Sequence, residues 1–315
     1  MDFMELLLVS LGSAIVFYYG VKLLLFSKIL YPKLWFPLPK SFFTSMGEWA
    51  VVTGGSDGIG KAYAFELAAQ GMNVVILSRT KEKLDKIAKE IGDTTGQKVK
   101  VIVADFTEET VFDEIENNLM DLKIGVLVNN VGILPTLIPS KFLETPDLEK
   151  AIVRVINCNV KTMAKMCRIT LPGMENRGKG VIINISSGTA CVNASIYSLY
   201  SSSKVFVETF SQALQAEYKD KGIIIQTVAP FGVSTNLSGY QRTNMVTITA
   251  EDFVKTSLQH IRAGDKTYGS VCHAVLAWIL QSIPHQILSS EAMQIRLKEY
   301  VKKRIAAASA RTSTS

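Results

Sequence analysis

The sequence is poor in the residues that most often bind metals, with three histidines and four cysteines among 315 residues. The cysteines are dispersed and form no Cys-x-x-Cys pair, which argues against a zinc ribbon and favours reduced thiols. They are Cys158, Cys167, Cys191 and Cys272. His273 and His285 have no metal-ligand spacing with any cluster of carboxylates, so we expect no metal site.

The sequence also lacks internal repeats, low-complexity tracts and any motif that binds RNA or DNA. The formal net charge is +6, but the basic residues are scattered along the chain and do not gather in one stretch. We therefore expect no nucleic-acid partner. Only residues 306–315 have the composition of a disordered segment.

Charge is almost absent from residues 6–26, where Lys22 is the only charged side chain. A helix of about 20 apolar residues spans the hydrocarbon core of a bilayer, and Lys22 lies near one end, where its ammonium can reach the headgroups. A cleaved signal peptide is the alternative, but the leading residues are acidic and no small-x-small cleavage site follows. We therefore predict a membrane anchor over residues 1–30.

The charges on the two sides of this span differ in sign. Asp2 and Glu5 precede it, whereas the charged side chains that follow it up to residue 40 are all lysines. The positive-inside rule therefore places the rest of the chain in the cytosol. Residues 31–37 are rich in aromatic residues and proline, which suits a membrane interface, and we expect an interfacial linker over residues 31–46.

After the linker, short apolar runs alternate with amphipathic helical patterns such as residues 81–91 and 110–122. The runs are residues 50–53, 74–77, 99–103, 126–129, 181–185 and 223–228. Runs of Val and Ile that alternate with helices are typical of a parallel sheet with helices on both faces. We predict an α/β fold with a single Rossmann-type doubly wound parallel sheet over residues 47–290, followed by a basic, partly disordered tail over residues 291–315.

The first apolar run is followed by a glycine-rich turn, Thr-Gly-Gly-Ser-Asp-Gly-Ile-Gly at residues 53–60, and then by a helical pattern. Glycines at such a turn let the backbone approach a pyrophosphate, whose charge the exposed amides and the helix dipole stabilise. A P-loop nucleotide triphosphatase is the alternative, because Gly55 and Gly60-Lys61 have nearly the right spacing. That motif needs Ser or Thr after the lysine to hold magnesium, and Ala62 stands there.

The end of the second run indicates which dinucleotide binds. Sites that prefer NAD carry an acidic side chain about 20 residues after the glycines, which accepts a hydrogen bond from the ribose 2′-hydroxyl. Here the run ends Leu-Ser-Arg-Thr at residues 77–80, without a carboxylate. The guanidinium of Arg79 can bind a 2′-phosphate through two hydrogen bonds, so we predict NADPH/NADP as the cofactor.

Tyr200 and Lys204 stand one helical turn apart and share a helix face. A nearby ammonium stabilises phenolate, lowers the pKa of a tyrosine and makes its phenol a competent general acid. The spacing alone is common, and Tyr18 with Lys22 also has it inside the predicted anchor. Tyr200, however, follows a run that ends Ser-Ser-Gly at residues 186–188, an edge where open α/β sheets bind ligands.

Over residues 47–275 the chain resembles the short-chain dehydrogenase/reductase family, because six sequence motifs of that family occur here in the same order. The cofactor-binding positions that the resemblance implies are Gly54, Ser56, Asp57, Gly58, Ile59, Gly60, Arg79, Asp105, Asn130, Tyr200, Lys204 and Val233. The catalytic positions that it implies are Asn159, Ser187, Tyr200 and Lys204. Phe231 replaces the usual glycine of the loop Pro-Gly-x-Val-x-Thr, which leaves the backbone path beside the nicotinamide open.

The family's chemistry implies a role for each catalytic residue. Tyr200 would protonate a carbonyl oxygen as hydride reaches the carbon, and Ser187 would hydrogen-bond that oxygen. Lys204 would lower the pKa of Tyr200 and bind the nicotinamide ribose, while Asn159 would hold a water that relays protons.

Within the family, the amino-acid sequences of several segments resemble those of the membrane-anchored 17β-hydroxysteroid dehydrogenases. This implies NADPH-dependent reduction of 17-ketosteroids, as of androstenedione to testosterone in androgen biosynthesis, at the endoplasmic reticulum membrane with the catalytic domain facing the cytosol. A very-long-chain 3-oxoacyl-CoA reductase of fatty acid elongation is the alternative, and a catalytically silent, membrane-tethered binding protein is a third. The partners implied are a steroid substrate and that membrane, and a homodimer is left open.

Two further segments are more apolar than a Rossmann sheet needs, residues 245–248 and 271–288. They fit a steroid pocket or a lid that dips into the membrane. A buried helix is an equal interpretation of the second segment.

Overall fold

The computed structural model describes residues 2–192, 195–239 and 242–312, with side chains as far as residue 306 in the last helix. Within these residues, seven parallel strands form one sheet in the order β3-β2-β1-β4-β5-β6-β9. They are β1 (Trp49–Thr53), β2 (Asn73–Ser78), β3 (Val99–Val103), β4 (Ile124–Asn129), β5 (Gly180–Ile185), β6 (Ile223–Val228) and β9 (Lys266–Thr267). The α/β prediction is confirmed, and each predicted run is a strand.

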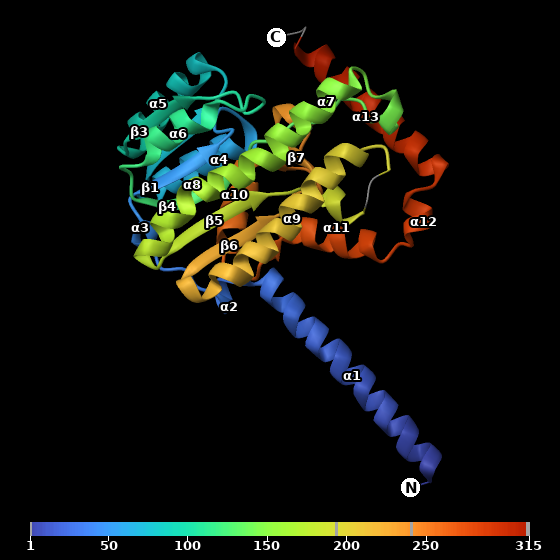
Figure 1. Ribbon diagram of the computed structural model, residues 1–315. Coiled ribbons are helices and arrows are strands. Elements are labelled where there is room, and N and C mark those ends of the chain that lie inside the picture. Colours follow the sequence, from blue (N-terminus) through green and yellow to red (C-terminus); the bar gives the residue numbers. More distant parts are fainter. Residues whose placement is uncertain (1, 193–194, 240–241, 313–315) are drawn as a thin grey trace.

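Helices cover both faces of this sheet. Successive residues of a strand point to opposite faces, so each strand contributes side chains to both helix layers. Ala50 and Val52 pack toward α4 (Gly58–Ala69), α5 (Lys81–Thr95) and α10 (Ala250–Gln259). Val51, between them, packs toward α6 (Val111–Leu119), α8 (Thr162–Arg177) and α9 (Ser198–Tyr218), which lie in front of the sheet in Figure 1. Both faces are therefore buried, which explains the continuous apolar runs.

Shorter elements connect these layers and surround the carboxyl ends of the strands. They are α7 (Leu148–Val155), η1 (Phe142–Glu144), the π-helical η2 (Ile156–Lys161), η3 (Gly188–Cys191), η4 (Lys219–Lys221), β7 (Val233–Ser234), η5 (Asn236–Ser238) and β8 (Ile248–Thr249). After β9 come α11 (Val271–Gln281), α12 (His285–Leu288) and α13 (Glu291–Thr312).

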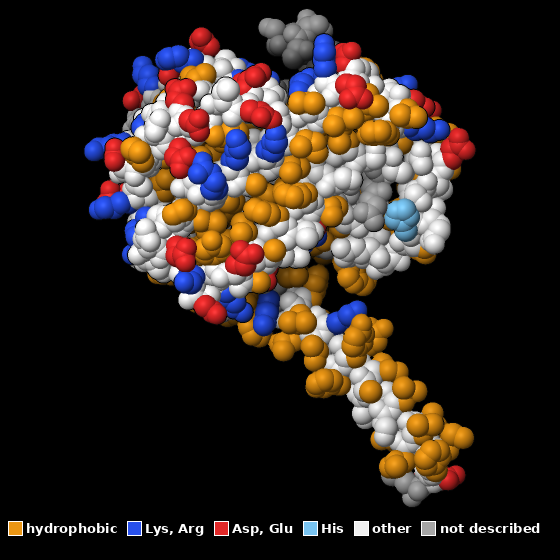
Figure 2. All heavy atoms as spheres, viewed as in Figure 1, with side chains coloured by type: hydrophobic (Ala, Val, Ile, Leu, Met, Phe, Trp, Pro, Cys, Tyr) orange, Lys and Arg blue, Asp and Glu red, His pale blue; other side chains and the backbone are white. Residues whose placement is uncertain are grey.

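The N-terminal helix α1 (Phe3–Leu30) projects away from the domain, and apolar side chains cover it (Figures 1 and 2). Among the described residues it is the one helix long and apolar enough to cross a membrane, and none of its residues is buried. At 1.5 Å per residue its length is about 42 Å, more than the roughly 30 Å of a hydrocarbon core. This agrees with the predicted anchor.

The segment predicted as a linker is partly built into the domain. It forms α2 (Pro32–Trp35) and α3 (Phe42–Met46), and α3 packs on β4. Phe42 and Phe43 are buried in the core, with their rings 5.0 Å apart. Burial of two aromatic side chains ties the end of this segment to the domain.

The predicted tail also differs from the structure, since residues 291–312 form helix α13 instead of a partly disordered segment. Val301 is buried, and Lys298 forms an ion pair of 3.8 Å with Glu144 in η1. Composition over residues 306–315 suggested disorder, but it contains an alanine run of high helix propensity that continues a helix packed upstream. Residues 313–315 lie outside the described part of the chain.

Candidate active site

The glycine-rich turn joins β1 to α4 with backbone angles that favour glycine. Gly54 has φ +68° and Gly58 has φ +53°, in the left-handed region. A Cβ at Gly60 would overlap the carbonyl oxygen of Gly54 and lie 2.5 Å from Asn130 Nδ2. Asp57 caps α4 by accepting a 2.6 Å hydrogen bond from Gly58 N, and Ile59 follows in the first turn. The turn thus leaves a side-chain-free cradle at a helix N-terminus, which fits a dinucleotide pyrophosphate.

Thr53, which the sequence analysis did not single out, holds this turn to the next strand end. Its Oγ1 accepts hydrogen bonds from Asn130 N at 3.0 Å and from Val131 N at 3.2 Å. In return, Asn130 Nδ2 donates to Thr53 O at 3.0 Å. The predicted site residue Asn130 therefore shapes the cradle from below. Because Thr53 opens the glycine motif, its place in that motif was the signal that could have found it.

The ends of β2 and β3 carry the residues expected on the adenine side. Ser56 and Ser78 share a hydrogen bond of 2.7 Å between their hydroxyls, and Arg79 follows with an exposed side chain. Among the described residues Arg79 has no ion-pair partner within 4.0 Å. Asp105 accepts hydrogen bonds from the backbone and hydroxyl of Thr107. Arg79 and Asp105 thus lie after neighbouring strands at the same sheet edge, with Arg79 free to meet a phosphate.

Asn159 lies in the π-helical turn η2, where it is almost wholly buried. Its Oδ1 accepts from Ile133 N at 2.8 Å, and its Nδ2 donates to Ile133 O and Ser203 Oγ, both at 3.0 Å. A π turn inserts an extra residue and re-aims side chains, and such turns are frequent at functional sites. Here the turn directs Asn159 to the loop after β4 and to the helix that carries Tyr200.

Ser187, Tyr200 and Lys204 converge where β5 ends and α9 begins. Ser187 caps η3, and its hydroxyl lies near enough to the phenol of Tyr200 to influence the pKa of that phenol. Lys204 is 3% exposed and donates a 2.9 Å hydrogen bond to the carbonyl oxygen of Ile185. Its ammonium lies 5.8 Å from the ring centre of Tyr200. The structure therefore places Ser187 and Lys204 beside the phenol of Tyr200, and Asn159 contacts the helix α9 that carries Tyr200 and Lys204.

Burial shifts the pKa values of both Tyr200 and Lys204. It raises the pKa of Tyr200, and the interaction with the hydroxyl of Ser187 acts in the opposite direction. Burial also lowers the pKa of Lys204 to about 8. The sequence suggested that the ammonium of Lys204 lowers the pKa of the phenol, whereas in the structure burial raises it. A tyrosine with its ordinary pKa of about 10 is protonated at neutral pH, and burial keeps Tyr200 in this form, as a proton donor must be.

The loop after β6 lies over the glycine turn. Val233 is buried in β7, and the methyl of Thr235 would be 2.8 Å from a Cβ on Gly58. Phe231, which stands where the family has glycine, packs its ring against Gly188 and stacks on Tyr268 with centroids 6.0 Å apart. The absence of a side chain at Gly188 makes room for this ring.

His273 of α11 holds the same loop and was not foreseen as a site residue. Its Nδ1 accepts from Phe231 N at 3.4 Å, and its Nε2 donates to Val246 O at 2.9 Å. This pattern requires the neutral Nε2–H tautomer, and burial accordingly lowers the pKa of His273. No sequence pattern links three positions so far apart, so only the fold reveals the contact.

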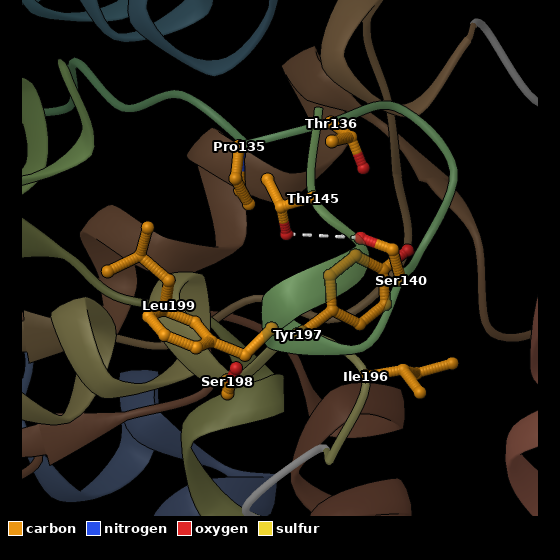
Figure 3. A pocket seen from close by; sticks show the side chains of 9 residues that line it. Pro135, Thr136, Ser140, Thr145, Ile196, Tyr197, Ser198 and Leu199 are labelled. Atoms are coloured by element: carbon orange, nitrogen blue, oxygen red, sulfur yellow. Dashed lines mark hydrogen bonds between the residues drawn. The ribbon is translucent and has the colours of Figure 1, made fainter. Parts of the chain in front are cut away.

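A small hollow opens beside the N-terminus of α9 (Figure 3). Its lining includes Pro135, Ser140 and Thr145 from the region after β4, and Tyr197 and Leu199 next to Tyr200. The hydroxyls of Ser140 and Thr145 are 3.2 Å apart. Burial raises the pKa of Tyr197 to about 12, so its phenol stays neutral. The hollow is a small recess of mixed polar and apolar lining next to the proton donor.

Comparison with known proteins agrees with this geometry. Residues 48–245 match the short chain dehydrogenase family. The chain is 57% identical to a 17-beta-hydroxysteroid dehydrogenase type 3 of Danio rerio, over 96% of this chain and 99% of the other. It is 40% identical to a very-long-chain 3-oxoacyl-CoA reductase of Homo sapiens, over 82% of this chain and 83% of the other.

Among solved structures, a short-chain dehydrogenase from Sphingobium yanoikuyae in complex with NADPH is 28% identical, with a TM-score of 0.64 over 70% of this chain and 86% of that one. The resemblance inferred from the motifs is thus confirmed at the level of sequence and of fold. The chain belongs to the short chain dehydrogenase family of oxidoreductases.

Proposed function

We propose that the chain reduces 17-ketosteroids to 17β-hydroxysteroids with NADPH, converting androstenedione to testosterone. The observation that carries the proposal is the 57% identity to a 17-beta-hydroxysteroid dehydrogenase type 3 along nearly the whole of both chains. The relative of that name from Homo sapiens is 48% identical over 95% of this chain. A site in which Ser187 and Lys204 lie beside the phenol of Tyr200 supports the reduction of a carbonyl group.

When bound, NADPH supplies the hydride that reaches the carbonyl carbon. Tyr200, whose phenol is protonated at neutral pH, donates its phenolic proton to the carbonyl oxygen. Ser187, whose hydroxyl lies beside that phenol, donates to the same oxygen as negative charge develops on it. The oxygen thus receives its proton from one side chain and is held by a second.

Lys204 and Asn159 support the proton transfer from the phenol of Tyr200. An ammonium has three donors, of which Ile185 O takes one, so Lys204 can also bind the ribose hydroxyls of the cofactor. At neutral pH, below its pKa of about 8, Lys204 is mostly charged and stabilises phenolate after the proton has left. Asn159 fixes the loop after β4 through Ile133, and we propose that it also holds a water that returns a proton toward Lys204.

The preference for NADPH rests on the end of β2. Arg79 is exposed there, without an ion-pair partner among the described residues, and a guanidinium binds a ribose 2′-phosphate better than a hydroxyl. Asp105, at the end of the adjacent strand, would lie beside the adenine. The structural relative from Sphingobium yanoikuyae, itself solved with NADPH, is consistent with this choice.

The second candidate function is very-long-chain 3-oxoacyl-CoA reduction, favoured by the 40% to 46% identity to reductases of that name. The experiment that separates the two supplies the full chain in microsomes with NADPH and either androstenedione or a long-chain 3-oxoacyl-CoA. We expect turnover of the steroid with a kcat/KM well above that for the thioester. The reverse ratio would assign the chain to fatty acid elongation, and no turnover of either would favour a silent binding protein.

The anchor and the assembly are part of the proposal. Helix α1 would enter the endoplasmic reticulum membrane with the catalytic domain in the cytosol, as the lysines after the span indicate. We also propose a homodimer through the apolar band that crosses the face of α8 and α9 in Figure 2. Val205 and Phe206 of α9 are exposed, and α9 packs against η2, in which Ile156 is exposed. Light scattering of the detergent-solubilised protein tests the dimer, and Phe206→Glu should convert it to a monomer.

A further inference from the structure

Helix α11 has one face in the core and one apolar face in solvent. His273, Ala274 and Ala277 are buried. Val275, Trp278 and Ile279 are 37%, 64% and 46% exposed. Positions i, i+3 and i+4 share a side of a helix, so these three side chains form a single surface. Ile287 of α12, which is 55% exposed, extends it, and we call these four residues the α11–α12 face.

This face differs from a solvated surface in its charge. No Asp, Glu, Lys or Arg stands between Lys266 and Glu291. A helix that faces water normally carries charged side chains on its outer side, and their absence removes the main cost of contact with lipid. Trp278, with an apolar ring and one N–H donor, is of the residue type enriched at membrane interfaces.

The position of the face indicates what covers it. Helix α11 packs against α1, and His260 at the end of α10 lies 2.9 Å from the carbonyl oxygen of Ile29 in the last turn of α1. In Figure 1, α1 leaves the domain on the side where α11 and α12 lie. A bilayer that α1 enters therefore passes close to the α11–α12 face.

We propose that the α11–α12 face rests on the lipid bilayer that α1 enters. The inference depends on the proposed membrane anchor and adds a second contact between the domain and the same membrane. The contact fixes the domain's orientation, because a single helix leaves the domain free to rotate about its attachment, whereas a second point does not. The chemistry of the partner is that of a lipid interface, with acyl chains below and headgroups around Trp278.

Helix α11 connects this lipid contact directly to the active site. Helix α11 packs against η3, which begins directly after Ser187. Through His273 it also binds Phe231 and Val246 in the loop over the glycine turn. The helix that faces lipid on one side thus holds η3 and the loop after β6, both beside the site, on the other. A ketone dissolved in the bilayer would reach the site beside α11 without crossing bulk water.

The test places an environment-sensitive NBD label on single cysteines of the full chain in phosphatidylcholine vesicles. The half-buried Cys191 and Cys272 are first replaced by alanine, and cysteine is then introduced at Trp278, Ile287, Leu7 or Met120. Met120 is apolar and 69% exposed but lies at the end of α6, and Leu7 lies in the anchor. Labels at Trp278 and Ile287 should emit at shorter wavelength and be quenched by nitroxide-labelled lipids, and the label at Met120 should not.

The label at Leu7 separates the two proposals. Quenching at Leu7 without quenching at Trp278 and Ile287 would overturn the α11–α12 contact and leave the anchor intact. No quenching at Leu7 would overturn the anchor itself. A blue shift at Trp278 that lipid nitroxides do not quench would mean that protein covers the face, which also contradicts the proposal.

A kinetic arm tests the consequence for substrate entry. Trp278→Glu places a charge on the exposed side of α11, and Met120→Glu places the same charge away from it. With a ketosteroid supplied in vesicles, Trp278→Glu should raise KM several-fold with kcat unchanged, and Met120→Glu should change neither. In detergent micelles the two variants should be equal. Equal KM values in vesicles would overturn entry from the lipid.

Discussion

The ammonium nitrogen of Lys204 donates a 2.9 Å hydrogen bond to the carbonyl oxygen of Ile185, although only 3% of the lysine is exposed. Burial lowers the pKa of this lysine from 10.5 to about 8. At pH 7 the folded state therefore bears a charged group in a poorly solvated place, at a cost of about 3 kcal/mol.

Replacing Lys204 by Met should therefore leave stability at pH 7 unchanged or slightly higher, while abolishing activity. Between pH 8 and 10.5 the unfolded chain binds more protons than the folded one, so the stability of the unsubstituted protein rises with pH. The variant lacks this rise and should become the less stable of the two near pH 10. Thermal unfolding in detergent at pH 7 and pH 10 measures it. A stability difference that stays constant with pH would contradict a lowered pKa of Lys204.

The same titration should appear in catalysis. Reduction needs the charged form of Lys204, which binds ribose and stabilises phenolate, so kcat/KM should fall above a pKa of about 8. Tyr200 does not produce this limb, because burial raises its pKa. Initial rates of NADPH-dependent ketone reduction from pH 6 to pH 10 provide the measurement. A rate that remains level to pH 10 would show that the charge on Lys204 is not required.

Tyr200→Phe removes the proton donor and keeps the ring. A positioned general acid contributes roughly 10²- to 10⁴-fold to the rate, so kcat should fall at least that far. The cofactor cradle lies at the end of β1 and does not include the phenolic oxygen, so the Kd for NADPH should change little. Fluorescence titration with NADPH checks the binding. Turnover close to that of the unsubstituted protein would sink the mechanism.

Arg79→Asp should move the cofactor preference from NADPH toward NADH. The substitution removes the guanidinium at the end of β2 and supplies a carboxylate that accepts from a ribose 2′-hydroxyl and repels a 2′-phosphate. The ratio of kcat/KM for the two cofactors should change by about tenfold or more, given the 1.5–3 kcal/mol of a charged hydrogen bond. Lys83→Asp, an equal change of charge on the exposed side of α5, is the control and should leave the ratio unchanged.

Much of the fold could be predicted because the strands of a parallel sheet buried on both faces appear in the sequence as short, nearly continuous apolar runs. Runs such as residues 181–185 are apolar except for Asn184, since Val181 and Ile183 face one helix layer and Ile182 faces the other. The site was predictable where it depends on local backbone geometry. Gly54 and Gly60 form the turn within eight residues, and Tyr200 and Lys204 share one turn of α9.

Features that depend on long-range packing could not be predicted in this way. The contact of His273 with Phe231 and Val246 joins positions 27 to 42 residues apart. The pKa of Tyr200 follows from how completely α9 is covered, which the sequence does not state. Likewise the last helix is ordered by Val301 and by the ion pair of Lys298, whereas composition alone describes only its terminal residues.

The glycine cradle offers the sharpest test of the fit to a dinucleotide, through Gly60→Ala. The added Cβ would overlap Gly54 O and lie 2.5 Å from Asn130 Nδ2, both parts of the cradle. We expect NADPH binding to be lost and stability to fall by roughly 1–3 kcal/mol, as in other overpacked sites.

Gly92→Ala in α5 is the matched control, because the nearest atom to its Cβ is Gln97 O at 3.9 Å. This second substitution relieves a helical glycine and should raise stability by about 0.5–1 kcal/mol with unchanged binding. Urea unfolding and NADPH titration of both variants make the comparison. If Gly60→Ala bound NADPH as tightly as Gly92→Ala, the cofactor could not lie against the turn at residues 54–60.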